Sequence, residues 1–272
     1  MAARAGTEFA GERGERTRPR APGPREDPRP SKWPFSPALD NWLRGRGYGE
    51  AKRDRYAYFY FDGSKPKPLF RGVFHEVFFA LSPFALSHLL SRSHSPRAVL
   101  AAAGYMLGWV TQYGVSSQFH RRQWGLAEEQ FLSDLDHVGI LAMVAASYCP
   151  LVMLLSDRAR AAMSAVLVGA VLLGARHAFV KRGGRAAETV VAIGMVLSVA
   201  PAASELFRLC TAHEWRLHCC ALLQYGVGGL AYAGHWPEPL PGVFGSQEVM
   251  HLLTCTGSLA TLAMASSICA RL

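Results

Sequence analysis

The chain has 272 residues, half of them hydrophobic, and this combination favours one membrane-type domain over two soluble domains. Its formal net charge of +9 raises the question of nucleic acid, but no RNA- or DNA-binding signature accompanies the basic residues, so we expect no nucleic-acid partner. The P-loop, GxGxxG, GxSxG and HExxH motifs are absent from the sequence, which excludes the common soluble-enzyme classes.

The first part of the chain is polar and basic. Residues 1–30 are rich in Arg, Pro and Gly, which predicts a disordered basic tail because such a segment cannot bury enough apolar surface to fold. Residues 31–71 interleave aromatic side chains with Lys and Arg, which indicates an interfacial juxtamembrane segment. A basic stretch before a membrane domain predicts a cytoplasmic amino terminus and attraction to anionic lipid.

The rest of the chain, residues 72–272, contains seven apolar stretches separated by short connectors. A membrane-spanning helix needs about 20 apolar residues. We therefore expect an all-α fold, a polytopic membrane protein with a bundle of seven transmembrane helices. The expected spans are roughly 73–90, 98–118, 138–155, 161–177, 186–206, 217–234 and 249–270. The fourth stretch ends in polar residues and glycines interrupt the sixth, so six spans are the alternative.

Three polar clusters sit where apolar stretches end, and alternating spans would bring all of them to one membrane face. Ionisable groups at such positions are costly to desolvate, so they are usually functional or paired. The clusters are Ser116 and His120 after the second stretch, Asp136 before the third, and Gln247, Glu248 and His251 around the start of the seventh.

Imidazoles and carboxylates that converge from separate helices can hold Zn²⁺ and leave one position open for water. The candidate metal ligands are His120, His251 and Glu248. Asp136 would orient the water or accept its proton, and Ser116 would donate a hydrogen bond to a substrate carbonyl or to Asp136.

The same residues also have simpler interpretations. A histidine at a helix end is often a solvated cap rather than a ligand. Ser133 and Asp134 are good N-cap residues for the third span. His75 and Glu76, at the start of the first span, are interpreted as interfacial residues and are weaker candidates for a functional site.

Three sequence segments, in order and at suitable spacing, resemble motifs of the progestin and adipoQ receptor / hemolysin III superfamily. The segments are SSQFH, LDHVGILAMVAASYCP and AYAGHWPEPLPGVFGSQEVMH, and the resemblance covers roughly residues 40–270. In that family three histidines near the cytoplasmic face hold zinc, and an aspartate holds its water. The resemblance places His120, His251 and Asp136 at matching positions, but Gln247 stands where the family has the remaining histidine.

The resemblance implies an integral membrane protein that is receptor-like and takes part in lipid or hormone signalling. Its ligand would be a small lipid or steroid-like molecule, and its zinc site would be degenerate because of Gln247. One alternative is a zinc-dependent hydrolase of ceramide-like lipid amides. Another is a non-catalytic membrane scaffold whose basic tail binds lipid.

Overall fold

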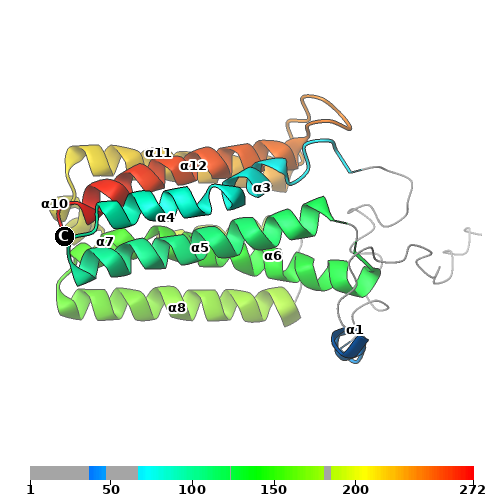
Figure 1. Ribbon diagram of the computed structural model, residues 1–272, viewed down its shortest axis with the longest axis horizontal. Coiled ribbons are helices and arrows are strands. Elements are labelled where there is room, and N and C mark those ends of the chain that lie inside the picture. Colours follow the sequence, from blue (N-terminus) through cyan, green and yellow to red (C-terminus); the bar gives the residue numbers. More distant parts are fainter. Residues whose placement is uncertain (1–36, 47–66, 123, 181–184) are drawn as a thin grey trace, which may run out of the picture.

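The computed structural model describes residues 37–46, 67–122, 124–180 and 185–272. The expected disordered tail, 1–30, and most of the expected interfacial segment, 31–71, lie outside these ranges. Within them, all regular secondary structure is helical apart from an isolated bridge between Leu240 and Phe244. The long helices run side by side along one axis, as Figure 1 shows, and this arrangement confirms the all-α prediction.

The chain passes back and forth through the bundle in sequence order (Figure 1). The described elements are α1 (Pro37–Arg44), α3 (Val73–Ala80), α4 (Ser82–Ser91), α5 (Pro96–Arg121), α6 (Leu126–Ser147), α7 (Cys149–Leu154), α8 (Asp157–Val180), α9 (Arg185–Leu197), η2 (Ala200–Ala202), α10 (Ala203–Leu209), α11 (Ala212–Gly234) and α12 (Ser246–Cys269).

Four helical segments of the described chain are long and apolar enough to cross a membrane. They are Ala127–Leu154, Asp157–Val180, Thr189–Leu209 and Ser246–Cys269. Helices α3 and α4 form a fifth if their pair, which is bent by 44°, counts as one broken span. The expected stretch 73–90 is therefore not one straight helix. Four or five candidate spans confirm a polytopic membrane protein but leave the expected number of seven unconfirmed.

The helix of the expected third span begins much earlier than the apolar pattern suggested. Helix α6 starts at Leu126 rather than near residue 138. Its N-cap is Gly125, whose backbone N–H donates to the Glu128 carboxylate at 2.8 Å. The interpretation of Ser133 and Asp134 as N-cap residues was therefore wrong, because a capped polar turn extends the helix beyond its apolar part. Asp136 consequently lies well inside α6 instead of opening it.

Helix α5 is central to the bundle and packs closely on α6. A Cβ atom on Gly108 would lie 2.2 Å from the Cβ of Ala146, so the two backbones approach as closely as a glycine allows. Buried Tyr105, Trp109 and Tyr113 form the aromatic centre of the adjoining core, and successive rings contact edge to face. This close contact fixes the end of α5 beside the first half of α6.

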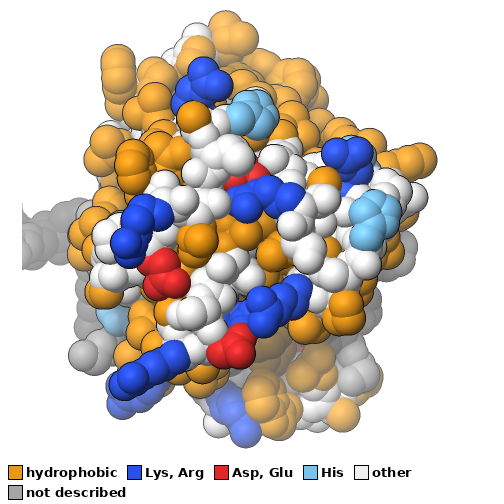
Figure 2. Space-filling model, turned by 90° about the vertical axis from the view of Figure 1, so that its left-hand side faces the viewer, with side chains coloured by type: hydrophobic (Ala, Val, Ile, Leu, Met, Phe, Trp, Pro, Cys, Tyr) orange, Lys and Arg blue, Asp and Glu red, His pale blue; other side chains and the backbone are white. Residues whose placement is uncertain are grey.

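The two ends of the bundle differ in character. Figure 2 shows the end at which the chain terminates, where basic side chains and a few acidic ones are spread over the face and hydrophobic side chains occupy much of the periphery. The exposed arginines on the elements at this end include Arg92, Arg97, Arg158 and Arg208. A charged end cap bordered by apolar flanks is the surface expected at a membrane–water interface. The polar clusters of the sequence lie at the opposite end.

Candidate functional site

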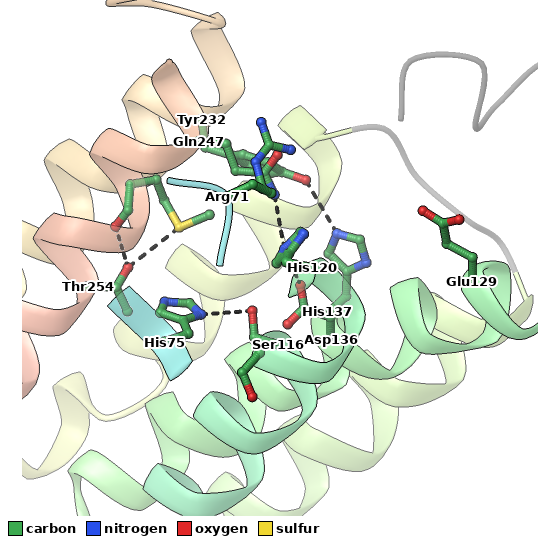
Figure 3. Close-up of polar contacts among 12 residues, drawn as sticks. Arg71, His75, Ser116, His120, Glu129, Asp136, His137, Tyr232, Gln247 and Thr254 are labelled. Atoms are coloured by element: carbon green, nitrogen blue, oxygen red, sulfur yellow. Dashed lines mark hydrogen bonds and ion pairs between the residues drawn. The ribbon is translucent and has the colours of Figure 1, made fainter. Parts of the chain in front are cut away.

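The end of α5, the first half of α6 and the starts of α3 and α12 meet at the end of the bundle away from the chain terminus (Figure 1). Figure 3 shows that the side chains from the three predicted clusters point toward one another there. Ser116, His120, Asp136, Gln247 and His251 are all buried. Helices that lie far apart in sequence therefore bring these predicted residues into one site.

His120 lies at the centre of the site. Its Nε2 atom is 3.5 Å from Asp136 Oδ2 and 3.2 Å from Gln247 Nε2. The other Asp136 oxygen, Oδ1, and the Gln247 oxygen, Oε1, are buried without a hydrogen-bond partner among the described residues. Unpaired buried oxygens are uncommon and costly, so they mark a position where a proton donor, water or cation would be stabilised.

His75, a weaker candidate from the sequence, is part of the same site. Its Nδ1 atom is 2.7 Å from Ser116 Oγ. Its ring stacks on that of His251, with centroids 4.0 Å apart and planes 25° from parallel, and it contacts Tyr113 edge to face. The interpretation of His75 as an interfacial residue was wrong, because the side chain is 1% exposed. Glu76, its neighbour, is exposed and forms an ion pair with Arg121 at 2.9 Å.

Gly72 allows α3 to begin this close to α5. It caps the helix with a φ of 75°, in the left-handed region that favours glycine. A Cβ atom at this position would lie 2.6 Å from His120 Cβ. Because no side chain intervenes, the first turn of α3 can place His75 against Ser116.

Glu248 lies in a different environment from the other predicted ligands. Its Oε1 atom accepts a hydrogen bond from Arg71 Nε in an ion pair whose two side chains are almost completely buried. Its Oε2 atom accepts from the backbone N–H of Gly245 at 2.8 Å and so caps α12. Both carboxylate oxygens are therefore occupied by protein donors, and the structure does not direct Glu248 toward His120.

The donor set can be tested against the zinc ion that the resemblance implies. Two imidazoles on one tetrahedral zinc ion have ring centroids about 5 Å apart, and His120 and His251 are 5.0 Å apart. His75 stacks too closely on His251 to share an ion with it. Gln247 offers an amide in place of an imidazole, and Glu248 is paired with Arg71. No group of three His, Cys, Asp or Glu residues in the described part of the chain is arranged to hold a metal ion. As placed, these residues do not fit a closed zinc site.

A cavity of about 230 Å³ adjoins this cluster. His75, Gln112 and His137 line one part of it, and apolar side chains of α6, α8, α9 and α11, such as Val144 and Ile193, line much of the rest. The lining contains no Asp, Glu, Lys or Arg among the described residues. It is a mostly apolar chamber with a few polar atoms, which is the usual composition of a small-molecule site.

The sequence interpretation gave His75 too little weight and missed Gln112, although a helical pattern contains both residues. His75 belongs to a buried stripe that continues through Ser82, Ala85 and Leu89, at intervals typical of one helix face. Gln112 lies one turn before Ser116 and two turns before His120, at successive i, i+4 positions. The S-x-x-x-H spacing could have been extended backwards to find it.

The fold and site define a class of protein: an all-helical membrane protein with a buried polar cluster beside an apolar cavity at one end of its bundle. The sequence pattern of the haemolysin-III related family matches residues 64–262 of the chain. This match covers more than half of the 272 residues. The chain belongs to this family, which confirms the resemblance seen in its motifs.

The buried Arg71–Glu248 pair provides a stability test of the site. We expect Glu248→Gln to lower the free energy of unfolding in detergent by about 3–5 kcal/mol, because it removes the carboxylate from a buried ion pair. The double variant Arg71→Met with Glu248→Gln should recover most of this loss. Glutamine keeps an oxygen that can cap Gly245 in both variants.

The matched control is the exposed pair Arg97–Asp157, whose atoms are 3.0 Å apart. Arg97→Met should cost no more than about 1 kcal/mol, because solvent screens an exposed ion pair. Equal losses in Glu248→Gln and Arg97→Met, measured by thermal melting of the purified full chain, would contradict the role of the buried pair.

Proposed function

We propose that this protein is a receptor-like membrane protein of the haemolysin-III related family that binds a small lipid inside its helix bundle. The observation that carries the proposal is the mostly apolar cavity, which reaches the buried polar cluster at His75. The apolar part of a lipid would lie among the side chains of α6, α8 and α9, and its polar end would lie at the cluster. The burial of apolar surface would supply most of the binding free energy.

We also propose that the zinc site of this chain is degenerate. The support is the chemistry of its donors: Gln247 replaces an imidazole, and Arg71 neutralises Glu248. Without a firmly held ion, Asp136 has no metal-bound water to activate, so a signalling role explains the geometry better than lipid amide hydrolysis. The apolar cavity likewise distinguishes a ligand-binding protein from a passive scaffold.

The zinc proposal predicts that Gln247→His raises zinc affinity, because it adds a third imidazole one turn before His251. Metal content of the purified full chain should be well below one zinc per chain in the wild type and close to one in Gln247→His. The gain should disappear when His120→Ala is added. Stoichiometric zinc in the wild type that is lost in both His120→Ala and His251→Ala would instead support the hydrolase.

The proposed topology has seven spans and a cytoplasmic amino terminus. Helices α5 and α11, with 26 and 23 residues, are long enough to cross a bilayer whose core is about 30 Å thick. They pack on candidate spans α6 and α12. Polar residues on both helices, such as Ser116 and Glu214, are buried within the bundle, so they do not prevent a membrane position.

This topology predicts that an epitope fused before residue 1 faces the cytosol, so antibody should reach it once the plasma membrane alone has been permeabilised. An epitope after Leu272 should be found on the opposite side of the membrane that holds the protein, because an odd number of spans separates the two ends. Both epitopes on the same side would exclude seven spans and favour six.

If a lipid binds in the cavity, a larger side chain in the cavity wall should weaken its binding. Ala192 lines the cavity, so Ala192→Phe should weaken retention of an added dodecyl-chain lipid by about tenfold or more, because the ring occupies the ligand's volume. Leu173→Phe is the control, since Leu173 lies on α8, is 71% exposed and is not part of the lining. Native mass spectrometry of the full chain would measure retention. Equal retention in both variants would place the lipid outside the bundle.

A further inference from the structure

The loop between α11 and α12, residues 235–245, lies at the end of the bundle that holds the polar cluster, and Figure 1 shows it extending outward past α12. Its largest side chains are exposed, Trp236 by 75% and Leu240 by 58%. The segment before α3 adds Leu69, which is 67% exposed, and Phe70, which is 38% exposed. We call these four residues the loop patch. Large apolar side chains that are exposed together mark a surface that binds a partner or a membrane.

The loop patch has a defined shape. Leu69 and Phe70 donate their backbone N–H groups to carbonyls of the loop, at 3.3 and 3.2 Å. The rings of Phe70, Phe74 and Phe244 contact one another, with centroids 6.0 to 6.1 Å apart. The apolar side chains are therefore exposed on a structured surface, which the loop and the start of α3 build together.

The backbone of the loop leaves few hydrogen-bond donors for water. Three of its residues are prolines, which have no N–H group: Pro237, Pro239 and Pro241. Most of the other residues donate their N–H groups to oxygen atoms of the chain, and these are His235, Trp236, Leu240, Val243, Phe244 and Gly245. An unpaired N–H group is costly in an apolar medium. This loop can therefore enter apolar surroundings at a lower cost than a loop whose N–H groups are bonded to water.

Two features favour lipid over a protein as the surface that covers the loop patch. First, exposed apolar side chains continue from Phe70 along α3 and α4, the bent candidate span, and include Val77, Phe79 and Phe84. The loop patch thus adjoins a flank that a bilayer would cover. Second, the amphipathic ring of tryptophan prefers the membrane–water interface. Glu238 is the single Asp, Glu, Lys or Arg residue of the loop, and it is exposed, so it can stay in water.

We propose that the loop patch inserts into the leaflet beside the polar cluster, and that Trp236, Leu240 and Leu69 lie at the boundary between head groups and acyl chains. This inference goes beyond the proposed ligand-binding function and does not depend on it. Because Leu69 lies just before α3, contact with lipid holds the first turn of α3, which carries His75, at a fixed depth. The partner that this surface fits is the bilayer itself.

The test asks whether residue 240 can be reached from water when the protein is in a bilayer. Full-length Leu240→Cys and Glu238→Cys are each reconstituted into nanodiscs of palmitoyl-oleoyl phosphatidylcholine and treated with a charged, water-soluble maleimide. Peptide mass spectrometry follows each thiol separately from the native cysteines. Each rate is divided by the rate of the same thiol in its isolated peptide, which corrects for intrinsic reactivity.

We expect Leu240→Cys to react at least about tenfold more slowly than Glu238→Cys, because a thiol in apolar surroundings forms little of the reactive thiolate. Leu173→Cys is the reference for a lipid-facing position, since Leu173 is 71% exposed on candidate span α8, and it should react slowly as well. Both loop positions are exposed, so each cysteine variant should melt at the wild-type temperature.

The fluorescence of Trp236 gives an independent measurement. Phosphatidylcholine that is brominated on the upper part of one acyl chain quenches a tryptophan by contact. In nanodiscs of this lipid, part of the wild-type emission should be quenched, and this part should be missing from Trp236→Phe. Trp109→Phe is the control, because Trp109 is 1% exposed in the core and its removal should leave the quenched part unchanged.

Two results would overturn the inference. If Leu240→Cys reacts as fast as Glu238→Cys in nanodiscs, the loop patch lies in water and is left for a protein partner, since the purified preparation contains none. If the brominated lipid quenches the wild type and Trp236→Phe to the same extent, Trp236 does not touch the acyl chains. Slow modification of Leu240→Cys together with quenching of Trp236 would establish insertion of the loop.

Discussion

The buried ion pair between Arg71 and Glu248 is the interaction on which the geometry of the site depends. It joins the residues before α3 to the first turn of α12, two parts of the chain separated by 177 positions. His75 follows Arg71 by four residues and His251 follows Glu248 by three. The stacking of the two imidazoles therefore occurs directly beside the pair. Since breaking a buried ion pair is strongly destabilising, this pair holds the two helix starts together.

Much of the site was predictable from the sequence because polar groups at the ends of apolar stretches have few acceptable positions in a bilayer. His120, Asp136 and His251 were expected together on this ground, and the structure brings them together. The partner of Glu248 was not predictable, because Arg71 lies in a loop and no periodicity connects the two residues. His75 was misinterpreted because it stands at the start of an apolar stretch, and this position in the sequence does not reveal whether the side chain faces water or the bundle.

Some helix boundaries of the fold could be predicted from the apolar pattern of the sequence, and others depend on local hydrogen bonds. The length of the apolar stretches predicts the positions of α8 and α12 closely, since both are long uninterrupted helices. It fails for α6, whose first turns are polar yet helical because Glu128 caps them. It also fails for α3 and α4, where Pro83 follows the break and the missing backbone donor ends one helix and starts another. Hydropathy measures solubility in lipid, whereas helix boundaries depend on hydrogen bonds.

The residues before α3 are bonded to the loop between α11 and α12. The backbone N–H groups of Leu69 and Phe70 donate to the carbonyls of Gly242 and Val243, and Phe70 also contacts Phe244 edge to face. Gly72 follows and lies directly against His120, because it has no side chain between them. A displacement of this loop would therefore reach the first turn of α3, whose His75 side chain lines the cavity. The chamber and the loop between α11 and α12 are in this sense mechanically linked.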